Sequence, residues 1–515
     1  MTQFLLMDYP GSIQFSMVLQ TTTPLEMTAN NELKNLQPAS VWSHFATLCA
    51  IPRPSLHEAA LREHLAGWAN ARGIGAIVDG AGNLILKKPG SPGCEAKPGV
   101  ILQAHLDMVS QANAGTQHDF ERDPIKAVVR DGWVIAEHTT LGADNGIGVA
   151  LALAALEEPD MPHPPMEVLL TVNEESGMDG ARGLAPGMLH GLALINLDTE
   201  EWGHFYLGCA GGADVEASRD CEQEEIPPGY VVLRFDVSGL RGGHSGIDIH
   251  LGRANAIKLL AEALRDLSAH TDVRLIGLNG GTARNAIPRE VFAVCALPAA
   301  AVSGIDAWAE HRLDAWRQRF AQADAKVSFR YELDEMPMAQ AIRREESDRL
   351  LAFLDIAANG VSLASSEFPG VTDTSSNLGV VRLAQGAFQA TFKVRSLHET
   401  HANTLAGKLL AHAQAFGLQA RKDGAYPGWA PNPASNLLAL CQRVYAAQFG
   451  QPASLQVIHA GLECGLLAAS HPQLDMISFG PDIRGAHAPG ERVEIESVAH
   501  CWQLLKAVLR ELTKA

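Results

Sequence analysis

The feature of this sequence that most constrains its fold is an alternation of strand-like and helix-like segments that stops near residue 213 and resumes near residue 431. In the first stretch, Leu56–Arg72 has apolar residues at helical spacing and Val100–Leu106 is almost continuously apolar. In the second stretch, Asn436–Phe449 is helix-like and Asp475–Phe479 is strand-like. Strands that alternate with helices favour a sheet with helices on both faces. We therefore expect an α/β domain, a mixed sheet flanked by helices.

The middle of the chain, residues 214–430, follows a different pattern. Its first half predicts the order β-α-β-β-α-β of a ferredoxin-like unit, in the segments Val231–Val237, Arg253–Leu267, Val273–Leu278, Val291–Leu297, Asp306–Ala323 and Val327–Leu333. A second, partial copy follows between residues 347 and 426. We interpret the middle as an inserted α+β domain with an internal duplication. The predicted organisation is a tail at 1–37, an α/β domain in two parts at 38–213 and 431–515, and the inserted domain at 214–430.

Charge and cysteine content exclude two classes of protein. The 515 residues include 40 Lys and Arg against 58 Asp and Glu, a formal charge of −18, whereas a nucleic acid is bound by a basic surface. The 8 cysteines include no Cys-x-x-Cys pair, which argues against a disulfide framework and for a reducing compartment. We expect a protein that does not bind nucleic acid.

Hydrophobic patterning disfavours secretion and membrane insertion. No apolar run approaches the roughly 18 residues of a membrane span. The first 33 residues contain no Lys or Arg, unlike the beginning of a secretory signal. We therefore expect a cytoplasmic protein without a membrane partner.

Polar side chains that can bind metal ions stand where the predicted strands of the α/β domain end. They are His105, Asp107, Asp144, Glu174, Glu175, Asp198 and His487. In open α/β sheets the ligand crevice lies beyond the carboxyl ends of the strands, so these side chains could meet at one place.

Each of these residues taken alone has an ordinary structural interpretation. His105 and Asp107 can be a packing pair, and Asp144 can cap the helix predicted after it. Asp198 can be a turn residue, and His487 can lie in a surface loop. The set is more informative than its members, because it contains the two imidazoles and three carboxylates that a pair of zinc ions takes as ligands when one carboxylate bridges them.

Three other motifs do not support the functions they resemble. The glycines of Gly142–Gly148 lack the spacing of a dinucleotide-binding loop. His398-Glu-Thr-His401 is one residue short of the His-Glu-x-x-His zinc motif, and Gly243-His-Ser-Gly246 lacks the spacing of a nucleophile elbow. We therefore predict neither a dinucleotide site nor a nucleophilic Ser245.

Five motifs together closely resemble the di-zinc aminoacylase/carboxypeptidase clan: Leu102-Gln-Ala-His-Leu-Asp-Met108, Gly142-Ala-Asp-Asn-Gly146, Asn173-Glu-Glu-Ser-Gly177, Asn196-Leu-Asp198 and the late His487. Within the clan, the chain is similar to the aminoacyl-histidine (Xaa-His, carnosine-type) dipeptidases in Gly208-Cys-Ala-Gly-Gly212, Gly239-Leu-Arg-Gly-Gly-His-Ser-Gly246, Arg284-Asn-Ala-Ile-Pro-Arg289 and Gly461-Leu-Glu-Cys-Gly465. The resemblance covers about residues 38–515. It implies a di-zinc exopeptidase-type catalytic domain with an inserted lid domain.

The resemblance implies which residues hold metal ions. His105 and Asp198 would hold one zinc ion. Glu175 and His487 would hold the other, and Asp144 would bridge the two. The implied cofactor is two Zn2+ per chain, with Co2+ or Mn2+ as alternatives that also accept nitrogen and oxygen ligands.

The two remaining residues of the set have implied catalytic roles. Asp107 would hydrogen-bond the far nitrogen of His105, which fixes the tautomer of the ring. Glu174 would be the general base that takes a proton from the attacking water and returns it to the leaving amine.

By the same resemblance, four residues contact the substrate: His244, Asn285, Arg395 and Gly461. His244 would stabilise the oxyanion, and Arg395 would bind the C-terminal carboxylate of the substrate with its planar fork. As ordinary alternatives, His244 can be a turn histidine and Arg395 an exposed charge at a strand end. In relatives with a single small lid the histidine comes from a partner subunit, which makes a homodimer an option. The duplicated lid predicts instead that His244 acts within its own chain.

The predicted function is metal-dependent hydrolysis of dipeptides with a free C-terminus, including Xaa-His. An N-acyl amino-acid deacylase is the alternative with the same chemistry. A non-catalytic binding protein on this fold is the alternative of a different class. All seven residues of the metal and base set are present, which argues against the non-catalytic alternative.

Overall fold

The computed structural model describes residues 30, 32–334, 339–366 and 368–514. The predicted tail, residues 1–37, lies mostly outside this part of the chain. Of its described residues, Leu33 is fully buried and the side chain of Asn30 hydrogen-bonds the main chain of Ile125 and Ala127. Packed structure therefore begins before residue 38. None of the described helices is long and apolar enough to cross a membrane.

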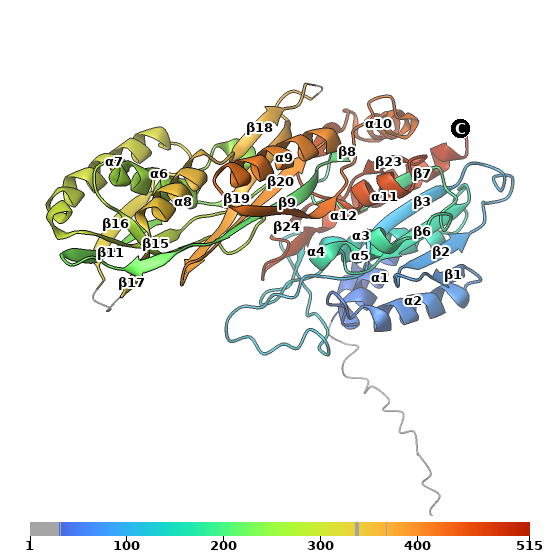
Figure 1. The fold of residues 1–515 in the computed structure, drawn as a ribbon. Coiled ribbons are helices and arrows are strands. Elements are labelled where there is room, and N and C mark those ends of the chain that lie inside the picture. Colours follow the sequence, from blue (N-terminus) through green and yellow to red (C-terminus); the bar gives the residue numbers. More distant parts are fainter. Residues whose placement is uncertain (1–29, 31, 335–338, 367, 515) are drawn as a thin grey trace, which may run out of the picture.

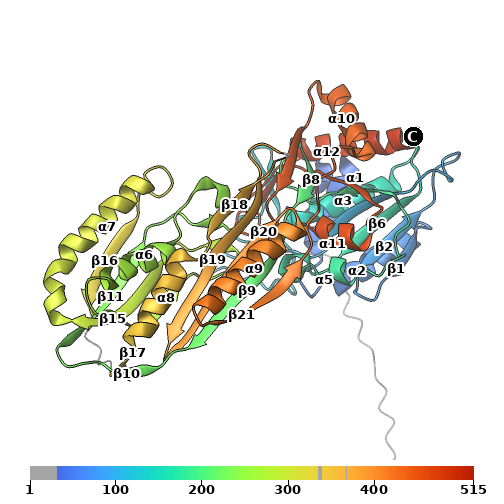
Figure 2. The same ribbon diagram turned by 45° about the horizontal axis from the view of Figure 1, so that its top comes forward.

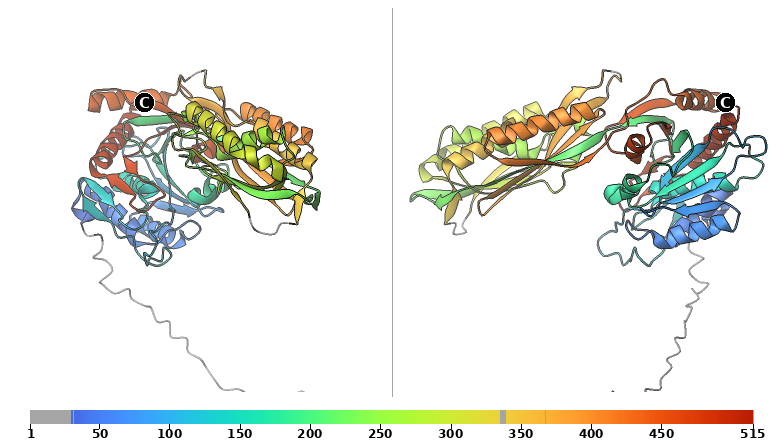
Figure 3. Two further views of the ribbon diagram at one scale, coloured as in Figure 1. Left: turned by 90° about the vertical axis from the view of Figure 1, so that its left-hand side faces the viewer. Right: turned by 45° about the vertical axis from the view of Figure 1, so that its right-hand side comes forward.

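Two units with separate large sheets make up the described residues (Figure 1). The inserted unit runs from β9 (Gly211–Asp220) to β21 (Gln419–Tyr426). The α/β unit consists of the elements before β9 and after β21. Figure 3 shows that the inserted unit extends away from the α/β unit along one long axis.

The α/β unit contains, in its described part, an eight-stranded sheet in the order β1-β2-β6-β3-β7-β23-β8-β22. Its strands are β1 (Gly75–Val78), β2 (Leu84–Lys88), β3 (Val100–His105), β6 (Met166–Thr171), β7 (Ala193–Asn196), β8 (His204–Cys209), β22 (Ser454–Ile458) and β23 (Asp475–Ser478). β3 is parallel to β6 and β7, and β23 is parallel to β7. These four strands therefore end at the same edge of the sheet.

Helices cover both faces of this sheet. The helices of the larger core are α1 (Ala39–Ala50), α2 (Ala59–Asn70), α3 (Ala143–Glu157), α10 (Asn436–Phe449) and α12 (Ile495–Leu512). Those of the smaller core are α5 (Asp179–Gly183) and α11 (Glu463–Ser470). The predicted α/β arrangement is confirmed.

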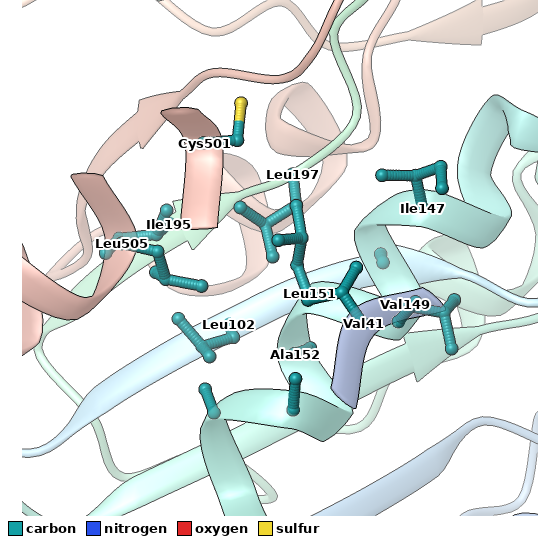
Figure 4. Close-up of a cluster of buried hydrophobic side chains, with 14 of the residues drawn as sticks. Val41, Leu102, Ile147, Val149, Leu151, Ala152, Ile195, Leu197, Cys501 and Leu505 are labelled. Atoms are coloured by element: carbon teal, nitrogen blue, oxygen red, sulfur yellow. The ribbon is translucent and has the colours of Figure 1, made fainter. Parts of the chain in front are cut away.

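Alternate residues of the buried strands pack into the two cores. In β3, Leu102 faces the larger core and Ile101 the smaller one. Leu102 and Ile195 lie beside Leu151 and Leu505 in the larger core (Figure 4). A strand that is buried on both faces is apolar at most positions, which explains the nearly continuous apolar run predicted from the sequence, with Gln103 and His105 as its buried polar residues.

A small sheet in the α/β unit positions the loop that carries His487. In the described residues its order is β24-β25-β5-β4, with strands β24 (Ile483–Arg484), β25 (Arg492–Glu494), β5 (Trp133–Ile135) and β4 (Val128–Arg130). The loop between β24 and β25 carries His487. The φ of this residue is 63°, a left-handed conformation that is uncommon for a residue with a side chain and that is often found at functional positions.

The inserted unit contains, in its described part, a nine-stranded sheet in the order β16-β11-β15-β13-β19-β20-β9-β21, with β18 paired to β19. Its other strands are β11 (Tyr230–Ser238), β13 (Arg274–Gly280), β15 (Val291–Pro298), β16 (Ser328–Leu333), β18 (Gly360–Ala364), β19 (Thr372–Ala384) and β20 (Ala387–Ser396). The helices α6 (Ala256–Ser268), α7 (Ile305–Arg319), α8 (Arg344–Ile356) and α9 (Glu399–Ala415) lie along one face of the sheet (Figures 1 and 2).

This sheet consists of two ferredoxin-like repeats joined side by side. In one repeat, β11-α6-β13-β15-α7-β16, the strands lie in the order β16-β11-β15-β13. In the other, β9-α8-β19-β20-α9-β21, they lie in the equivalent order β21-β9-β20-β19, and the repeats meet where β13 pairs with β19. The predicted duplication is confirmed.

One part of the predicted duplication was wrong. The second copy is complete rather than partial, because its first strand, β9, precedes the whole first copy in the chain. The predicted boundary at 213/214 falls inside this strand, so β9 was not recognised as part of the second copy. The first copy is therefore inserted inside the second.

Each insertion is closed by a pair of antiparallel segments at its base. Where the chain leaves and returns to the α/β unit, the main-chain N–H groups of Cys209 and Trp429 donate to each other's carbonyls, at 2.9 and 3.0 Å. Where the chain enters and leaves the first repeat, β10 (Gln223–Glu225) pairs with β17 (Gln340–Ile342). The first repeat is thus inserted into the second repeat, and the whole unit is inserted into the α/β domain.

Candidate metal centre and substrate site

The strand ends of the α/β unit bring the predicted metal-binding residues together. His105 is the last residue of β3, and Glu174 and Glu175 begin the short helix α4 (Glu174–Gly177) after β6. Asp144 is in the first turn of α3 and Asp198 follows β7. Because β3, β6 and β7 are parallel, their carboxyl ends form one side of a crevice.

Each imidazole of the set faces two carboxylates. His105 Nε2 lies 3.2 Å from Asp144 Oδ1 and 3.3 Å from Asp198 Oδ1. His487 Nε2 lies 3.2 Å from Asp144 Oδ2 and 3.0 Å from Glu175 Oε2. Asp144 therefore points a different oxygen at each histidine, as a carboxylate does when it bridges two metal ions.

These residues fit a metal centre on two grounds. Ligand atoms of His105, Asp144 and Glu175 all lie within 4.8 Å of one another. Glu175 Oε1 is buried and has no hydrogen-bond partner, although buried polar atoms are normally paired. A cation bound between the histidines and the carboxylates would supply the missing partner.

The protonation of the histidines also fits a site for positive charge. Hydrogen bonds with Asp144 and Glu175 raise the pKa of His487 to about 11. Burial lowers the pKa of His105, but the charge of Asp198 and its hydrogen bonds with carboxylates raise it well above the usual range. A metal ion that binds here would displace the protons of the two imidazole rings, because the metal ion then balances the charge of the carboxylates.

Asp107 holds both the imidazole and the chain after β6. His105 Nδ1 lies 3.1 Å from the main-chain oxygen of Asp107 and 3.4 Å from its Oδ1. The carboxylate of Asp107 also accepts hydrogen bonds from Ser55 Oγ and from the main-chain N–H groups of Glu174 and Glu175, at 2.7, 2.9 and 3.1 Å. Burial raises the pKa of Asp107, but the contacts with His105 and Ser55 lower it to about 2. An ionised Asp107 leaves the other ring nitrogen free for a metal ion.

Three buried residues hold these loops in place, and two of them, Arg53 and Glu491, lie outside every motif. Arg53 donates to three main-chain carbonyls in the segments that carry Asp107 and Asp144. Glu491 accepts from three main-chain N–H groups at the start of α3. Asn145 joins the ends of β3 and β7 through its side-chain amide. Their roles follow only from the fold, since each is distant in sequence from its partners.

Glu174 combines burial with a position at the metal centre. Burial raises the pKa of Glu174 well above its usual range, which the charge of His105 opposes and neighbouring carboxylates reinforce. Behind it, Glu463 Oε2 accepts hydrogen bonds from Gln103 Nε2 and Thr171 Oγ1, both at 2.6 Å, and burial raises the pKa of Glu463 to about 7. A raised pKa suits a carboxylate that takes and returns a proton near neutral pH.

In the inserted unit, His244 and Arg395 bring two hydrogen-bond donors together. His244 Nδ1 accepts from the main-chain N–H groups of Gly246 and Ile247, at 3.2 and 3.0 Å, so the neutral ring carries its proton on Nε2. This Nε2 lies 3.3 Å from Arg395 Nη2, which is also a donor. Burial lowers the pKa of His244 to about 4, with help from the charges of Arg395 and His487. Two neighbouring donors of this kind can bind the negatively charged oxygens of a ligand.

Arg395 is a buried cation at the end of β20. Only 5% of it is exposed, so the alternative of an exposed strand-end charge is wrong. Its Nη1 donates to Tyr426 Oη at 2.9 Å and its Nε to Ser245 Oγ at 3.4 Å. Within the described residues Arg395 forms no ion pair with a carboxylate. A buried charge is normally paired, so the guanidinium is available for an anionic ligand.

The other two predicted substrate-binding residues lie close to this guanidinium. The main-chain oxygen of Asn285 accepts from Ser245 N at 2.8 Å, and Asn285 is exposed. Gly461 packs against Tyr426, because a Cβ at this position would lie 3.1 Å from the Tyr426 ring. The structure thus gathers His244, Arg395, Asn285 and Gly461 around one site, while their contact with a substrate stays a prediction.

His459 is a further buried histidine that no motif marks. It follows β22 in the α/β unit, and its Nε2 lies 2.8 Å from the hydroxyl of Ser375 on β19 of the inserted unit. Its Nδ1 is buried without a hydrogen-bond partner. Burial lowers the pKa of His459 to about 3, with help from the charge of Arg395. His459 therefore connects the two units beside the anion site as a neutral ring.

Comparison with known proteins identifies the family of this chain. Residues 101–511 match peptidase family M20/M25/M40. The chain belongs to peptidase family M20/M25/M40. This M20 peptidase is 41% identical over 482 residues to the cytosol non-specific dipeptidase of Escherichia coli, across 94% of this chain and 99% of that protein.

Solved structures agree with this assignment. The aminoacylhistidine dipeptidase from Vibrio alginolyticus has a TM-score of 0.84 and 40% sequence identity to the M20 peptidase, over 93% of this chain and 98% of that chain. Aminopeptidase PepT from Bacillus cereus has a TM-score of 0.54 at 17% identity, over 93% of this chain and 99% of that chain, which shows a shared fold. The predicted resemblance to the Xaa-His dipeptidases, the predicted fold with its lid and the predicted class of enzyme are confirmed.

Proposed function

We propose that this M20 peptidase hydrolyses dipeptides with a free C-terminus, including those that end in histidine. The observation that carries the proposal is the pairing of a two-metal ligand set with an anion site. Asp144 lies between His105 and His487 in the α/β unit, and the donors of His244 and Arg395 converge in the inserted unit. The names of the E. coli and Vibrio relatives, both dipeptidases, support the same class of substrate.

The α/β unit supplies the hydrolytic chemistry. When bound, zinc polarises the scissile carbonyl and lowers the pKa of a water to about 7. Glu174 takes the proton of the attacking water on a carboxylate oxygen and delivers it to the nitrogen of the leaving amine. Its raised pKa suits both transfers. Asp107 keeps the ring of His105 in one orientation throughout.

The inserted unit holds the substrate and the charge that develops on it. Arg395 binds the C-terminal carboxylate with two parallel N–H groups. His244 donates from Nε2 to the oxyanion that forms on the scissile carbonyl. The charge of His487 contributes to the lowered pKa of His244, which supports our proposal that His244 acts in its own chain. Asn285 and Gly461 complete the substrate site.

We also propose the finer features that the resemblance implies. The site holds two Zn2+ per chain, and Co2+ or Mn2+ can replace zinc because histidine and carboxylate ligands accept all three ions. The location is cytoplasmic, as the name of the E. coli relative states for that protein. The inserted domain runs from the beginning of β9 to the end of β21, close to the predicted boundaries at 213/214 and 430/431.

Hydrolysis of a peptide panel by the metal-replenished enzyme tests the proposal. The panel contains carnosine, other Xaa-His dipeptides, Gly-Gly, the amide of Gly-Gly, tripeptides and N-acetyl amino acids. Dipeptides should be cleaved fastest, and the amide should have a kcat/KM lower by about 10²-fold, because it lacks the carboxylate that Arg395 binds. Faster cleavage of N-acetyl amino acids than of any dipeptide would make the chain a deacylase instead.

A further inference from the structure

We propose that a pocket beside Glu175 binds the side chain of the N-terminal residue of the dipeptide, and that it favours apolar and basic side chains over acidic ones. This inference rests on the proposed function, in which a dipeptide is held at the metal centre. The pocket has a volume of about 640 Å³, which is within the usual range of small-molecule sites.

Two segments of the α/β unit form the walls of this pocket. One wall is the segment Pro54–His57 between α1 and α2, and the other is the loop from Met108 to Glu121 that follows β3. The walls contact each other, since Pro54 and Met108 form a β-bridge and His57 Nε2 lies 3.8 Å from Glu121 Oε1. Glu175 at the start of α4 completes the lining.

The position of the pocket assigns it to the N-terminal residue. Glu175 belongs both to the metal centre and to the lining of the pocket, so the two adjoin. All lining residues come from the α/β unit, whereas Arg395 and His244 belong to the inserted unit. A dipeptide with its carboxylate at Arg395 and its scissile carbonyl at the metal centre has one residue left, and the adjoining pocket is the space for its side chain.

Apolar side chains give the pocket its affinity for apolar residues. Met108, Val109 and Phe120 line it. The ring of His118 packs edge-on against Phe120, with centroids 4.5 Å apart, which restrains the aromatic wall. Leu56, between two lining residues, is 72% exposed and has a φ of 72°. An apolar side chain held outward in an unfavourable conformation is a feature of ligand sites.

The charged residues of the pocket set its polarity. Asp119, Glu121 and Glu175 line it, and among its lining residues in the described chain there is no Lys or Arg. With Glu175 engaged at the metal centre, the remaining carboxylates are Asp119, whose Oδ2 lies 3.6 Å from Arg122 Nε, and Glu121, whose Oε1 lies 3.8 Å from His57 Nε2. An acidic substrate side chain would be repelled here and a basic one attracted. The effect is modest because both carboxylates are exposed to solvent and screened.

Measurement of kcat/KM on two series of dipeptides tests the proposal. The first series varies the N-terminal residue, in Gly-Gly, Leu-Gly, Lys-Gly and Glu-Gly, and the second is the reversed set Gly-Leu, Gly-Lys and Gly-Glu. Phe120→Ala should lower the ratio of Leu-Gly to Gly-Gly by about tenfold, the usual cost of lost apolar contact in a pocket. Glu121→Gln should lower the ratio of Lys-Gly to Glu-Gly by about threefold. The ratios within the reversed series should stay at their wild-type values.

Matched variants outside the pocket control for general damage. Phe320→Ala, at the end of α7, and Glu345→Gln, on α8, change the same residue types in the inserted unit and should keep all ratios. Phe120→Leu keeps most of the apolar volume and should lower the Leu-Gly to Gly-Gly ratio less. It replaces the alanine variant if that variant does not fold.

Two results would overturn the inference. One is that the Phe120 and Glu121 variants keep the wild-type ratios in the first series. The other is that they change the ratios of the reversed series instead, which would assign the pocket to the C-terminal residue. A failure of the proposed function itself looks different, because the wild-type enzyme would then cleave neither series.

Discussion

In the proposed function, the two units of this protein make opposite contributions to one site. The α/β unit contributes a cluster in which carboxylates outnumber imidazoles, built on the ends of strands that are buried on both faces. The inserted unit contributes a guanidinium and a neutral imidazole, placed by the end of β20 and by the two-residue strand β12 (Gly243–His244). The first half is suited to binding cations, and the second half is suited to binding an anion.

This difference in charge indicates that the α/β unit binds the metal ions and the inserted unit binds the substrate carboxylate in the proposed function. A metal pair and a peptide carboxylate would satisfy the two halves at once, because each half provides the charge opposite to its ligand. Damage to the α/β half should abolish metal binding or the chemical step. Damage to the inserted half should weaken substrate binding and leave the metal centre intact. Four predictions test this division.

The largest effect is expected from the bridging position. Asp144→Asn removes a charge that faces both His105 and His487, so the purified protein should hold fewer metal ions per chain and lose activity by at least the factor expected for loss of the base, about 10²–10⁴. Metal analysis after dialysis measures the content. Asp314→Asn, on an exposed part of α7, is the matched control and should keep its metal. A metal content equal to wild type in Asp144→Asn would remove Asp144 from the centre.

The second effect separates chemistry from metal binding within the same half. Glu174→Gln should lower kcat by about 10²–10⁴-fold, because a neutral amide cannot take the proton of the water. Its metal content should equal that of wild type, since Glu174 is the base in our proposal and not a ligand. Steady-state kinetics and metal analysis on one preparation measure both. Full activity in this variant would refute the role of Glu174.

The third effect belongs to the inserted half. Arg395→Ala should raise KM for dipeptides and lower kcat/KM by about 10- to 100-fold, the value of a charge-assisted pair of hydrogen bonds. Arg395→Lys should recover only part of this, since an ammonium lacks the planar fork. With a dipeptide amide as substrate, the alanine variant and wild type should differ little. An unaltered KM for dipeptides would remove Arg395 from the carboxylate site.

The smallest effect concerns the contact between the halves. Burial lowers the pKa of His459 to about 3 from an ordinary value of 6.5, so below pH 6.5 the unfolded chain takes up a proton that the folded chain does not. The stability that depends on neutral His459 is therefore lost as the pH falls from 6.5 toward 3. At pH 5 the free energy of unfolding should be about 2 kcal/mol lower than at pH 7.5 on this account.

A variant isolates this contribution from those of other groups. His459→Gln can keep the hydrogen bond with Ser375 but does not titrate. Urea unfolding at pH 7.5 and pH 5 should show a smaller loss of stability in the variant than in wild type. The same loss in both proteins would show that His459 does not carry the pH dependence.

Much of the fold could be predicted from the sequence because its signals are local. The helix predicted at Asn436–Phe449 has those bounds in the structure, and the strand predicted at Val100–Leu106 is one residue shorter. The strand β9 was missed, since it begins at two glycines and Val215 is its one larger apolar residue. Its membership of the second repeat depends on pairing with β20 and β21, far along the chain.

The candidate site also contains some residues that the sequence could predict and others that it could not. The proposed metal ligands lie at strand ends, in a first helical turn or in a loop, within motifs of the family, so the sequence pattern and the resemblance could point to them. Arg53, Glu491 and His459 could not be predicted, because a single polar residue has no local pattern and its partners are distant in sequence. The burial of Arg395 was equally hidden, since it results from the position of β20 between β19 and β9.

The paired segments at the base of each insertion have a consequence for how such a chain can be redesigned. Cys209 and Trp429 are hydrogen-bonded neighbours, so a short turn between them could replace the whole inserted unit without displacing β8. A turn between β10 and β17 could likewise remove one repeat and spare the other. The chain can therefore be shortened at two places, the Cys209–Trp429 pair and the β10–β17 pair. A gene for the α/β unit alone would encode the hydrolytic domain, to which other substrate-binding domains could be joined.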